Sequence, residues 1–163
     1  MKRIDKQLLD DLTAKAAASP RKRAHHNLHP VLEDPVQRLC VALEPGTYIR
    51  PHRHADPSTW EVFILLRGSA VFLVFDDAGK VEERIVLKAG GPVQAIEIPA
   101  AAWHSITSLE QGTIFLEVKQ GPYSAPKEGN SASWAPAEGE VATARFEAWY
   151  RNASVGDGPP QLS

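Results

Sequence analysis

The chain has 163 residues, which suits one domain and is long enough to bury a core without disulfides or a structural metal. Its 18 lysines and arginines nearly balance its 20 aspartates and glutamates, so no overall positive field favours a nucleic-acid partner. The single cysteine, Cys40, excludes an internal disulfide, and we expect a protein of the reducing cytoplasm.

The first 30 residues predict one amphipathic helix and a basic connector. Apolar residues recur at helical spacing over residues 4–18, Asp5 is a suitable N-cap, and Ser19-Pro20 ends the pattern. Charged residues interrupt any apolar leader near the N-terminus. No apolar run approaches the roughly 20 residues of a membrane-spanning helix. We therefore expect neither export nor a membrane partner.

The middle of the chain predicts strands. Short runs rich in valine, isoleucine, leucine and phenylalanine alternate with turn residues over residues 36–43, 47–54, 60–66, 69–75, 81–87, 93–98, 103–108 and 113–119. Eight strands without intervening helices favour an all-β antiparallel sandwich or barrel. The strands over residues 60–66 and 69–75 are apolar on both faces. We expect the N-terminal helix to cover one outer face and a second copy of the chain, in a homodimer, to cover another.

The C-terminal region is rich in glycine and proline and predicts loops, with order expected only over residues 144–150. Its aromatic residues need cover from water, so it either wraps back over the barrel or packs against a partner chain. We divide the chain into residues 1–30 (helix and connector), 31–120 (barrel) and 121–163 (extension).

Four residues are candidates for a metal site. His52 and His54 are two apart on the strand predicted over residues 47–54, so both side chains leave the same face. His104 supplies a third imidazole and Glu61 a carboxylate. This set suits a divalent first-row metal (Fe, Mn, Ni, Co or Zn) with open coordination positions. Glu61 could instead form an outward ion pair, and Asp56 is a rival carboxylate, although Asp56-Pro57-Ser58 is typical of a turn.

Three more residues are candidates for binding a substrate from the barrel. Tyr48 and Arg50 share the parity of the histidine pair, so we predict that both face the cavity and orient an anionic or hydroxylated substrate. The alternative places them at the barrel mouth, in contact with water or a buried carboxylate. Trp103, like Trp60, either stacks on a sugar or packs in the core.

The basic connector carries three histidines and a run of three cations. His25, His26 and His29 form a second metal cluster, an exposed tract, or a segment in which His29 closes the barrel mouth as a ligand-binding residue. The run Arg21-Lys22-Arg23 is expected to be solvated or ion-paired with Asp10 and Asp11; otherwise it attracts an anionic substrate.

The histidine region resembles the first motif of the cupin superfamily. Gly46 precedes His52 by five intervening residues, and Gly68 follows Glu61 by six, although the gap between His54 and Glu61 is longer than the motif has. Pro99 and His104 match the second motif, where Ala101 replaces a glycine and predicts an ordinary turn. The resemblance covers residues 36–119. It implies a double-stranded β-helix, a jelly-roll barrel, preceded here by the N-terminal α-helix.

A narrower resemblance is to WbuC-type cupin metalloproteins, often encoded near surface-polysaccharide genes. It is carried by residues 23–29 and 48–54, Gly121-Pro122-Tyr123 and Trp134. It implies a cupin metalloprotein of undefined activity, and we expect the protein to act on or bind a small anionic or hydroxylated, sugar-like ligand. Two classes stay open: a metal-dependent oxygenase, isomerase or lyase, and a non-catalytic module that binds a sugar or sugar phosphate.

Overall fold

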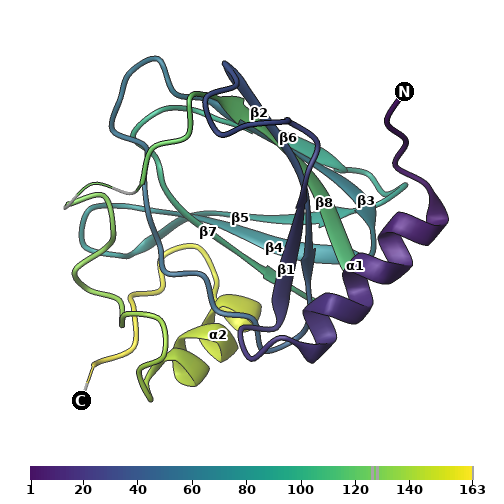
Figure 1. The fold of residues 1–163 in the computed structure, drawn as a ribbon. Coiled ribbons are helices and arrows are strands. Elements are labelled where there is room, and N and C mark those ends of the chain that lie inside the picture. The colour runs from purple at the N-terminus through teal and green to yellow at the C-terminus, as the bar shows by residue number, and fades with distance from the viewer. Residues whose placement is uncertain (126, 128, 163) are drawn as a thin grey trace.

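Two antiparallel sheets form the body of the computed structural model, which describes residues 1–125, 127 and 129–162 (Figure 1). One sheet has the strand order β1-β2-β8-β3-β6 and the other β5-β4-β7. The strands are β1 (Arg23–Asn27), β2 (Val36–Leu43), β3 (Glu61–Arg67), β4 (Ser69–Phe75), β5 (Val81–Lys88), β6 (Ala95–Ile98), β7 (Trp103–Ser108) and β8 (Thr113–Gln120). This arrangement confirms the predicted all-β class.

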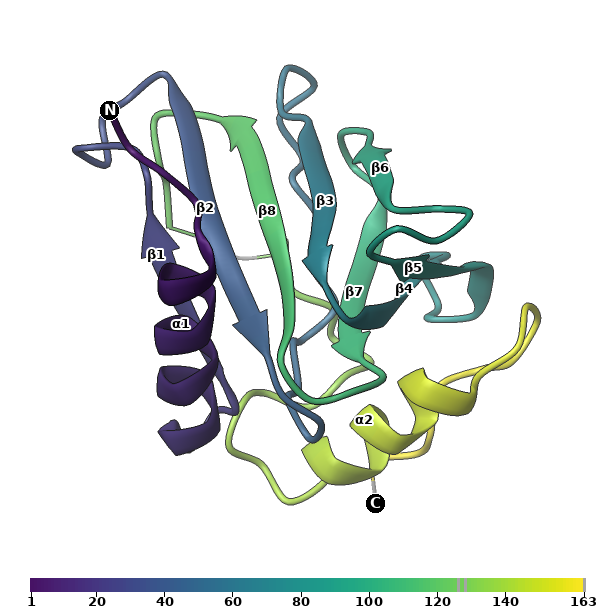
Figure 2. The ribbon, with the colours of Figure 1, turned by 90° about the vertical axis from the view of Figure 1, so that its right-hand side faces the viewer.

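Helix α1 (Lys6–Ala18) confirms the predicted N-terminal helix and lies alongside β1 and β2 (Figure 2). The Asp5 side chain caps it by accepting the Leu8 N–H at 3.0 Å. Its Leu12 and Ala16 pack against Cys40 and Ala42 of β2. The intervening residues of β2 face the other way, into the space between the sheets. Strand β2 is therefore apolar on both faces because α1 covers its outer face.

Helix α2 (Thr143–Asn152) covers the outer face of the three-stranded sheet. Its Phe146 and Tyr150 pack against Val71 and Leu73 of β4, whereas Phe72 of the same strand faces the core between the sheets. The C-terminal region thus wraps back over the sheet, and α2 is longer than the predicted 144–150. Helix α2 thus covers the outer face of β4, one of the two strands that suggested a second copy, and the homodimer stays a prediction.

Two segments differ from the predicted elements. Strand β1 lies inside the predicted connector, where Arg23 pairs with Leu43 and Asn27 with Leu39 of β2. Its backbone hydrogen bonds compensate for a polar sequence without apolar alternation, as is common in edge strands. Residues 47–54 form no strand, apart from bridges made by His52, because Pro51 interrupts the segment and has no N–H for a ladder.

The three-part division of the chain stays a prediction, and residues 126, 128 and 163 of its last part lie outside the described residues. Neither helix among the described residues has the length and hydropathy needed to cross a bilayer.

Candidate metal centre

Strand register places Glu61 on the inner face of the five-stranded sheet. Gln37 of β2 pairs with Lys119 of β8, Lys119 pairs with Glu61 of β3, and Glu61 pairs with Ile98 of β6. Directly paired residues point to the same side of a sheet, so this row forms one inward-facing line. Glu61 is buried within it.

Backbone pairing with β7 brings His52 beside His104. The His52 N–H donates to the His104 carbonyl at 3.1 Å, and the His104 N–H donates to the His52 carbonyl at 3.0 Å. Residues directly opposite in such a pair have neighbouring side chains. A local backbone bridge, rather than the predicted strand, therefore brings the two imidazoles together across about 50 residues of sequence.

The turn before β7 holds His54. The Ala101 N–H donates to the His54 carbonyl at 2.8 Å, and Ala101 has a φ of +65°. The prediction of an ordinary turn at this position is wrong: the left-handed conformation, which suits glycine, occurs here with an alanine. The hydrogen bond to His54 compensates part of the strain.

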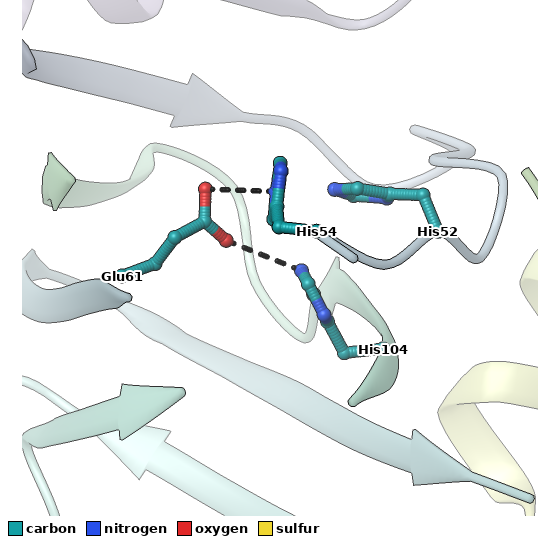
Figure 3. A group of neighbouring side chains, drawn as sticks. All are labelled: His52, His54, Glu61 and His104. Atoms are coloured by element: carbon teal, nitrogen blue, oxygen red, sulfur yellow. Dashed lines mark ion pairs between the residues drawn. The ribbon is translucent and has the colours of Figure 1, made fainter. Parts of the chain in front are cut away.

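The side chains of His52, His54, Glu61 and His104 converge on one point. Each offers a ligand atom, and these atoms all lie within 4.8 Å of one another. Glu61 Oε1 lies 3.1 Å from His54 Nε2, and Glu61 Oε2 lies 3.3 Å from His104 Nε2. Figure 3 shows that the two carboxylate oxygens face different imidazoles. The three imidazoles and the carboxylate are therefore a candidate ligand set for one metal ion.

Hydrogen bonds at Nδ1 of His52 and His104 select the imidazole tautomer that can bind a metal through Nε2. His52 Nδ1 lies 3.1 Å from the Arg50 carbonyl, and His104 Nδ1 lies 2.9 Å from the Ala102 carbonyl. A carbonyl only accepts, so each Nδ1 must carry the proton and each Nε2 keeps its lone pair. Such contacts orient metal-ligating histidines in known sites.

Several of the converging atoms have no hydrogen-bond partner. His54 Nε2, His104 Nε2 and Glu61 Oε2 are buried, and their short mutual distances lack hydrogen-bond geometry. Buried polar atoms without partners cost free energy. A divalent cation among them would satisfy all of them, so the donor set fits a metal.

The charge states of His52 and Glu61 also suit metal binding. Burial, helped by the neighbouring His104, lowers the pKa of His52 to about 3, so its ring is neutral at neutral pH. Burial alone would raise the pKa of Glu61, but His104, His54 and Lys119 outweigh it and hold the pKa well below its usual range. The centre thus offers a neutral imidazole and an ionised carboxylate, the forms that bind metals.

A cavity of about 370 Å³ adjoins the cluster. His52, Glu61 and His104 line one part of it, apolar side chains such as Phe63 and Phe115 line the walls, and further polar residues are Arg21, Arg23, His25, Glu117, Lys119 and Tyr123. Glu117 and Lys119 were not among the predicted site residues. They follow Phe115 at intervals of two along β8, and this spacing is the sequence signal that would have placed them on the same inner face.

The residues predicted to bind substrate lie elsewhere. Tyr48 is buried against Tyr150, and its hydroxyl donates to the Pro136 carbonyl at 2.8 Å. Arg50 donates from Nε and Nη2 to the Ala132 carbonyl. Trp103 Nε1 donates to Asp77 at 2.9 Å. None of these three lines the cavity. The parity argument for Tyr48 and Arg50 fails because their segment is not a strand.

The connector histidines and cations also separate. His25 and His26 are both exposed, and of the two only His25 lines the cavity. The buried His29 accepts the Arg38 N–H at Nδ1 and does not line the cavity. The predicted ion pairs of the basic run with Asp10 and Asp11 are wrong, because Arg21 and Arg23 both pair with Glu138. Asp10 pairs with Lys6 and Arg67 instead, and Asp11 accepts from Gln7. Asp56 accepts from Ser58 in its own turn, outside the cluster.

Comparisons with known proteins identify the fold. The chain is similar to solved structures of KdgF from Halomonas sp. (16% identity, TM-score 0.50, 66% of this chain and 85% of that chain). It is also similar to oxalate oxidase in complex with the substrate analogue glycolate (18%, 0.52, 67% and 56%) and to a cupin superfamily protein from Desulfitobacterium hafniense DCB-2 (18%, 0.50, 67% and 86%). At this identity the likeness shows the fold alone, which is the cupin jelly roll.

No curated protein matches the chain. One family model does, that of the domain of unknown function DUF6016, and it matches residues 4–87. The match includes α1, β1, His52, His54 and Glu61, and it spans just over half of the sequence. The chain is therefore a cupin-fold protein that belongs to the DUF6016 family.

Proposed function

We propose that this protein is a cupin metalloprotein in which His52, His54, Glu61 and His104 hold one divalent transition metal, with a small ligand bound in the adjoining cavity. The observation that carries the proposal is the convergence of four ligand atoms within 4.8 Å of one another. The partnerless buried nitrogens and oxygen of the same cluster support it.

A metal held by four protein ligands keeps open positions if it prefers six, and it would polarise a ligand oxygen bound there. The chain's own residues prepare that chemistry. The carbonyls of Arg50 and Ala102 fix the imidazole tautomers. Lys119 Nζ lies 3.3 Å from Glu61 Oε1 and 2.6 Å from Glu117 Oε1, and it holds the carboxylate in place.

The ligand that this cavity suits is small and carries hydroxyl or anionic oxygens. The volume of the cavity lies at the lower end of the range for small-molecule sites. The resemblance to WbuC-type cupins supports a link to surface-polysaccharide metabolism and, through it, a sugar-like ligand. The single cysteine, Cys40, supports a cytoplasmic location. Both an enzyme of the oxygenase, isomerase or lyase type and a non-catalytic sugar-binding module fit this site.

Elemental analysis of the protein purified without chelators tests the proposal. We expect about one Fe, Mn, Ni, Co or Zn per chain, reduced at least tenfold in His52→Ala because one of four ligands is lost. His26→Ala, which removes an exposed imidazole outside the cluster, is the matched control. A metal-free wild type that also fails to take up these ions, or equal losses in both variants, would refute the site.

Turnover separates the two functional classes once the metal is established. Metal-loaded protein is incubated with a panel of diols, keto acids and nucleotide sugars. Product formation or oxygen consumption that disappears in His52→Ala indicates the enzyme, whereas saturable binding without turnover indicates the module.

A further inference from the structure

Two arginines line the cavity on the side of β1. Arg23 and His25 alternate with Ala24 along this strand, and Ala24 packs against the buried face of α1. Successive side chains of a strand point to opposite faces, so Arg23 and His25 lie on the face away from α1. Both line the cavity, as does the small Ala24 between them. Arg21, just before the strand, also lines it. None of these positions belongs to the metal cluster.

A carboxylate from the C-terminal extension bridges the two guanidinium groups. Glu138 Oε2 lies 2.5 Å from Arg21 Nη2, and Glu138 Oε1 lies 2.5 Å from Arg23 Nη2. Arg23 is held in addition by a bond from Nη1 to the Tyr48 carbonyl at 2.6 Å. One carboxylate with one oxygen on each arginine is the arrangement in which paired guanidinium groups bind an acid.

The exposed fractions of the Arg21, Arg23 and Glu138 side chains indicate that another carboxylate can replace Glu138. Arg21 is 60% exposed and Glu138 36%, so their ion pair contributes little and is easily broken. Arg23 is only 17% exposed, and a largely buried cation needs an anion close by. Replacing Glu138 by another carboxylate would keep Arg23 paired, whereas removing Glu138 alone would not.

We infer that Arg21 and Arg23 form a carboxylate-binding subsite at the rim of the cavity, where Glu138, which is not itself a lining residue, is their partner until the carboxylate of a ligand displaces it. Combined with the proposed function, on which this step rests, the subsite defines the ligand class as a small hydroxylated acid. Its hydroxyl or second oxygen group lies toward His52, Glu61 and His104, and its carboxylate lies at the β1 side of the same cavity.

Succinate binding to the full-length chain, freed of metal with a chelator, tests the subsite without involving the metal centre. Affinity is measured by titration calorimetry at constant ionic strength. We expect Glu138→Gln to bind succinate about two- to fivefold more tightly, because the internal competitor is gone while the shape is kept. Glu140→Gln removes the same charge from an exposed residue of the same loop and should leave the affinity unchanged.

Substituting either arginine is expected to weaken succinate binding. Arg21→Gln should weaken succinate binding at least fivefold, whereas Lys15→Gln, which removes one positive charge from the exposed side of α1, should not. Because Arg21 is exposed, this variant keeps the proposal testable even if Arg23→Gln fails to fold. The proposal is overturned if Glu138→Gln behaves like Glu140→Gln, if Arg21→Gln behaves like Lys15→Gln, or if no variant binds succinate up to tens of millimolar.

The two proposals fail separately. Elemental analysis reports on the four-residue cluster whether or not succinate binds. Succinate affinity in the metal-free chain reports on Arg21, Arg23 and Glu138 whether or not the cluster holds a metal.

Discussion

Single residues in the metal centre are held by backbone groups on both sides. The Arg50 and Ala102 carbonyls accept hydrogen bonds from the Nδ1–H groups of His52 and His104, and the Ala101 N–H donates to the His54 carbonyl. Side-chain identity alone supplies the nitrogens and oxygens, but these backbone contacts decide which nitrogen faces the centre. A ring that could rotate freely would lose conformational entropy on binding a metal, so this fixation favours affinity.

Substitutions of Ala101 test how far the backbone conformation near His54 is strained. Its φ of +65° is unfavourable for any residue with a Cβ, and its side chain is exposed, so a substitution there acts through the backbone. We expect Ala101→Gly to change the free energy of unfolding by less than about 1 kcal/mol, since relieved strain offsets the greater freedom of the unfolded chain. Ala101→Val should lower it by about 1–3 kcal/mol.

Urea unfolding of both variants gives these values. Ala78→Val is the control, because Ala78 is an exposed turn alanine without a positive φ. A valine at position 101 as harmless as the one at position 78 would show that the turn relaxes and that no strain is held there.

At the scale of elements, the segment that carries His52 and His54 is held between β7 and residues 130–132. Arg53 N–H donates to the Asn130 carbonyl at 3.0 Å, and Ala132 N–H donates to the Pro51 carbonyl at 2.9 Å. Arg50 adds two bonds to the Ala132 carbonyl, at 3.0 and 2.7 Å. The C-terminal extension therefore does for this segment what a neighbouring strand would have done in a continuous sheet.

Arg50→Met is expected to weaken metal binding without touching a ligand. The thioether side chain keeps most of the apolar stem but loses both bonds to Ala132, so the His52 segment becomes more mobile. Loss of such an outer contact lowers metal affinity by about 10- to 100-fold in known sites. Competition with a chromophoric chelator measures the dissociation constant.

Arg84→Met is the matched control, because Arg84 also donates to a backbone carbonyl, that of Arg151, and neither residue contacts the segment that carries His52. Equal thermal destabilisation of both variants with unchanged metal affinity would mean that Arg50 has a structural role only.

These elements also show what the sequence could predict. The apolar runs predicted the sheets because burial is a local property. The grouping of His52 and His54 was predicted from a strand over residues 47–54 that does not form, and the backbone bridge between His52 and His104 brings the rings together instead. Strand β1 was missed because its pairing with β2 depends on backbone hydrogen bonds, which polar residues make equally well. The inward position of Arg21 and Arg23 and their pairing with Glu138, more than 110 residues away, depend on tertiary structure and leave no local pattern.

For the whole molecule, the buried cluster couples folding to pH. The pKa of His52 is lowered to about 3 from an ordinary value of 6.5, so below pH 6.5 the unfolded chain binds a proton that the folded chain does not. The pKa of Glu61 is also lowered in the folded chain, so protons bind preferentially to the unfolded chain below about pH 4.5. Both effects act in the same direction: stability falls as the pH falls.

We therefore expect the free energy of unfolding of the metal-free chain to decrease as the pH falls from 7 to 4. Each group contributes a slope of up to about 1.4 kcal/mol per pH unit, His52 from pH 6.5 downward and Glu61 from about 4.5. Urea unfolding at a series of pH values measures the slope. His52→Ala should flatten it between pH 6.5 and 4.5, whereas His26→Ala, which removes an exposed ring, should leave it unchanged. A wild-type slope of zero in that interval, or one equally steep in His52→Ala, would contradict a neutral, partly buried imidazole at position 52.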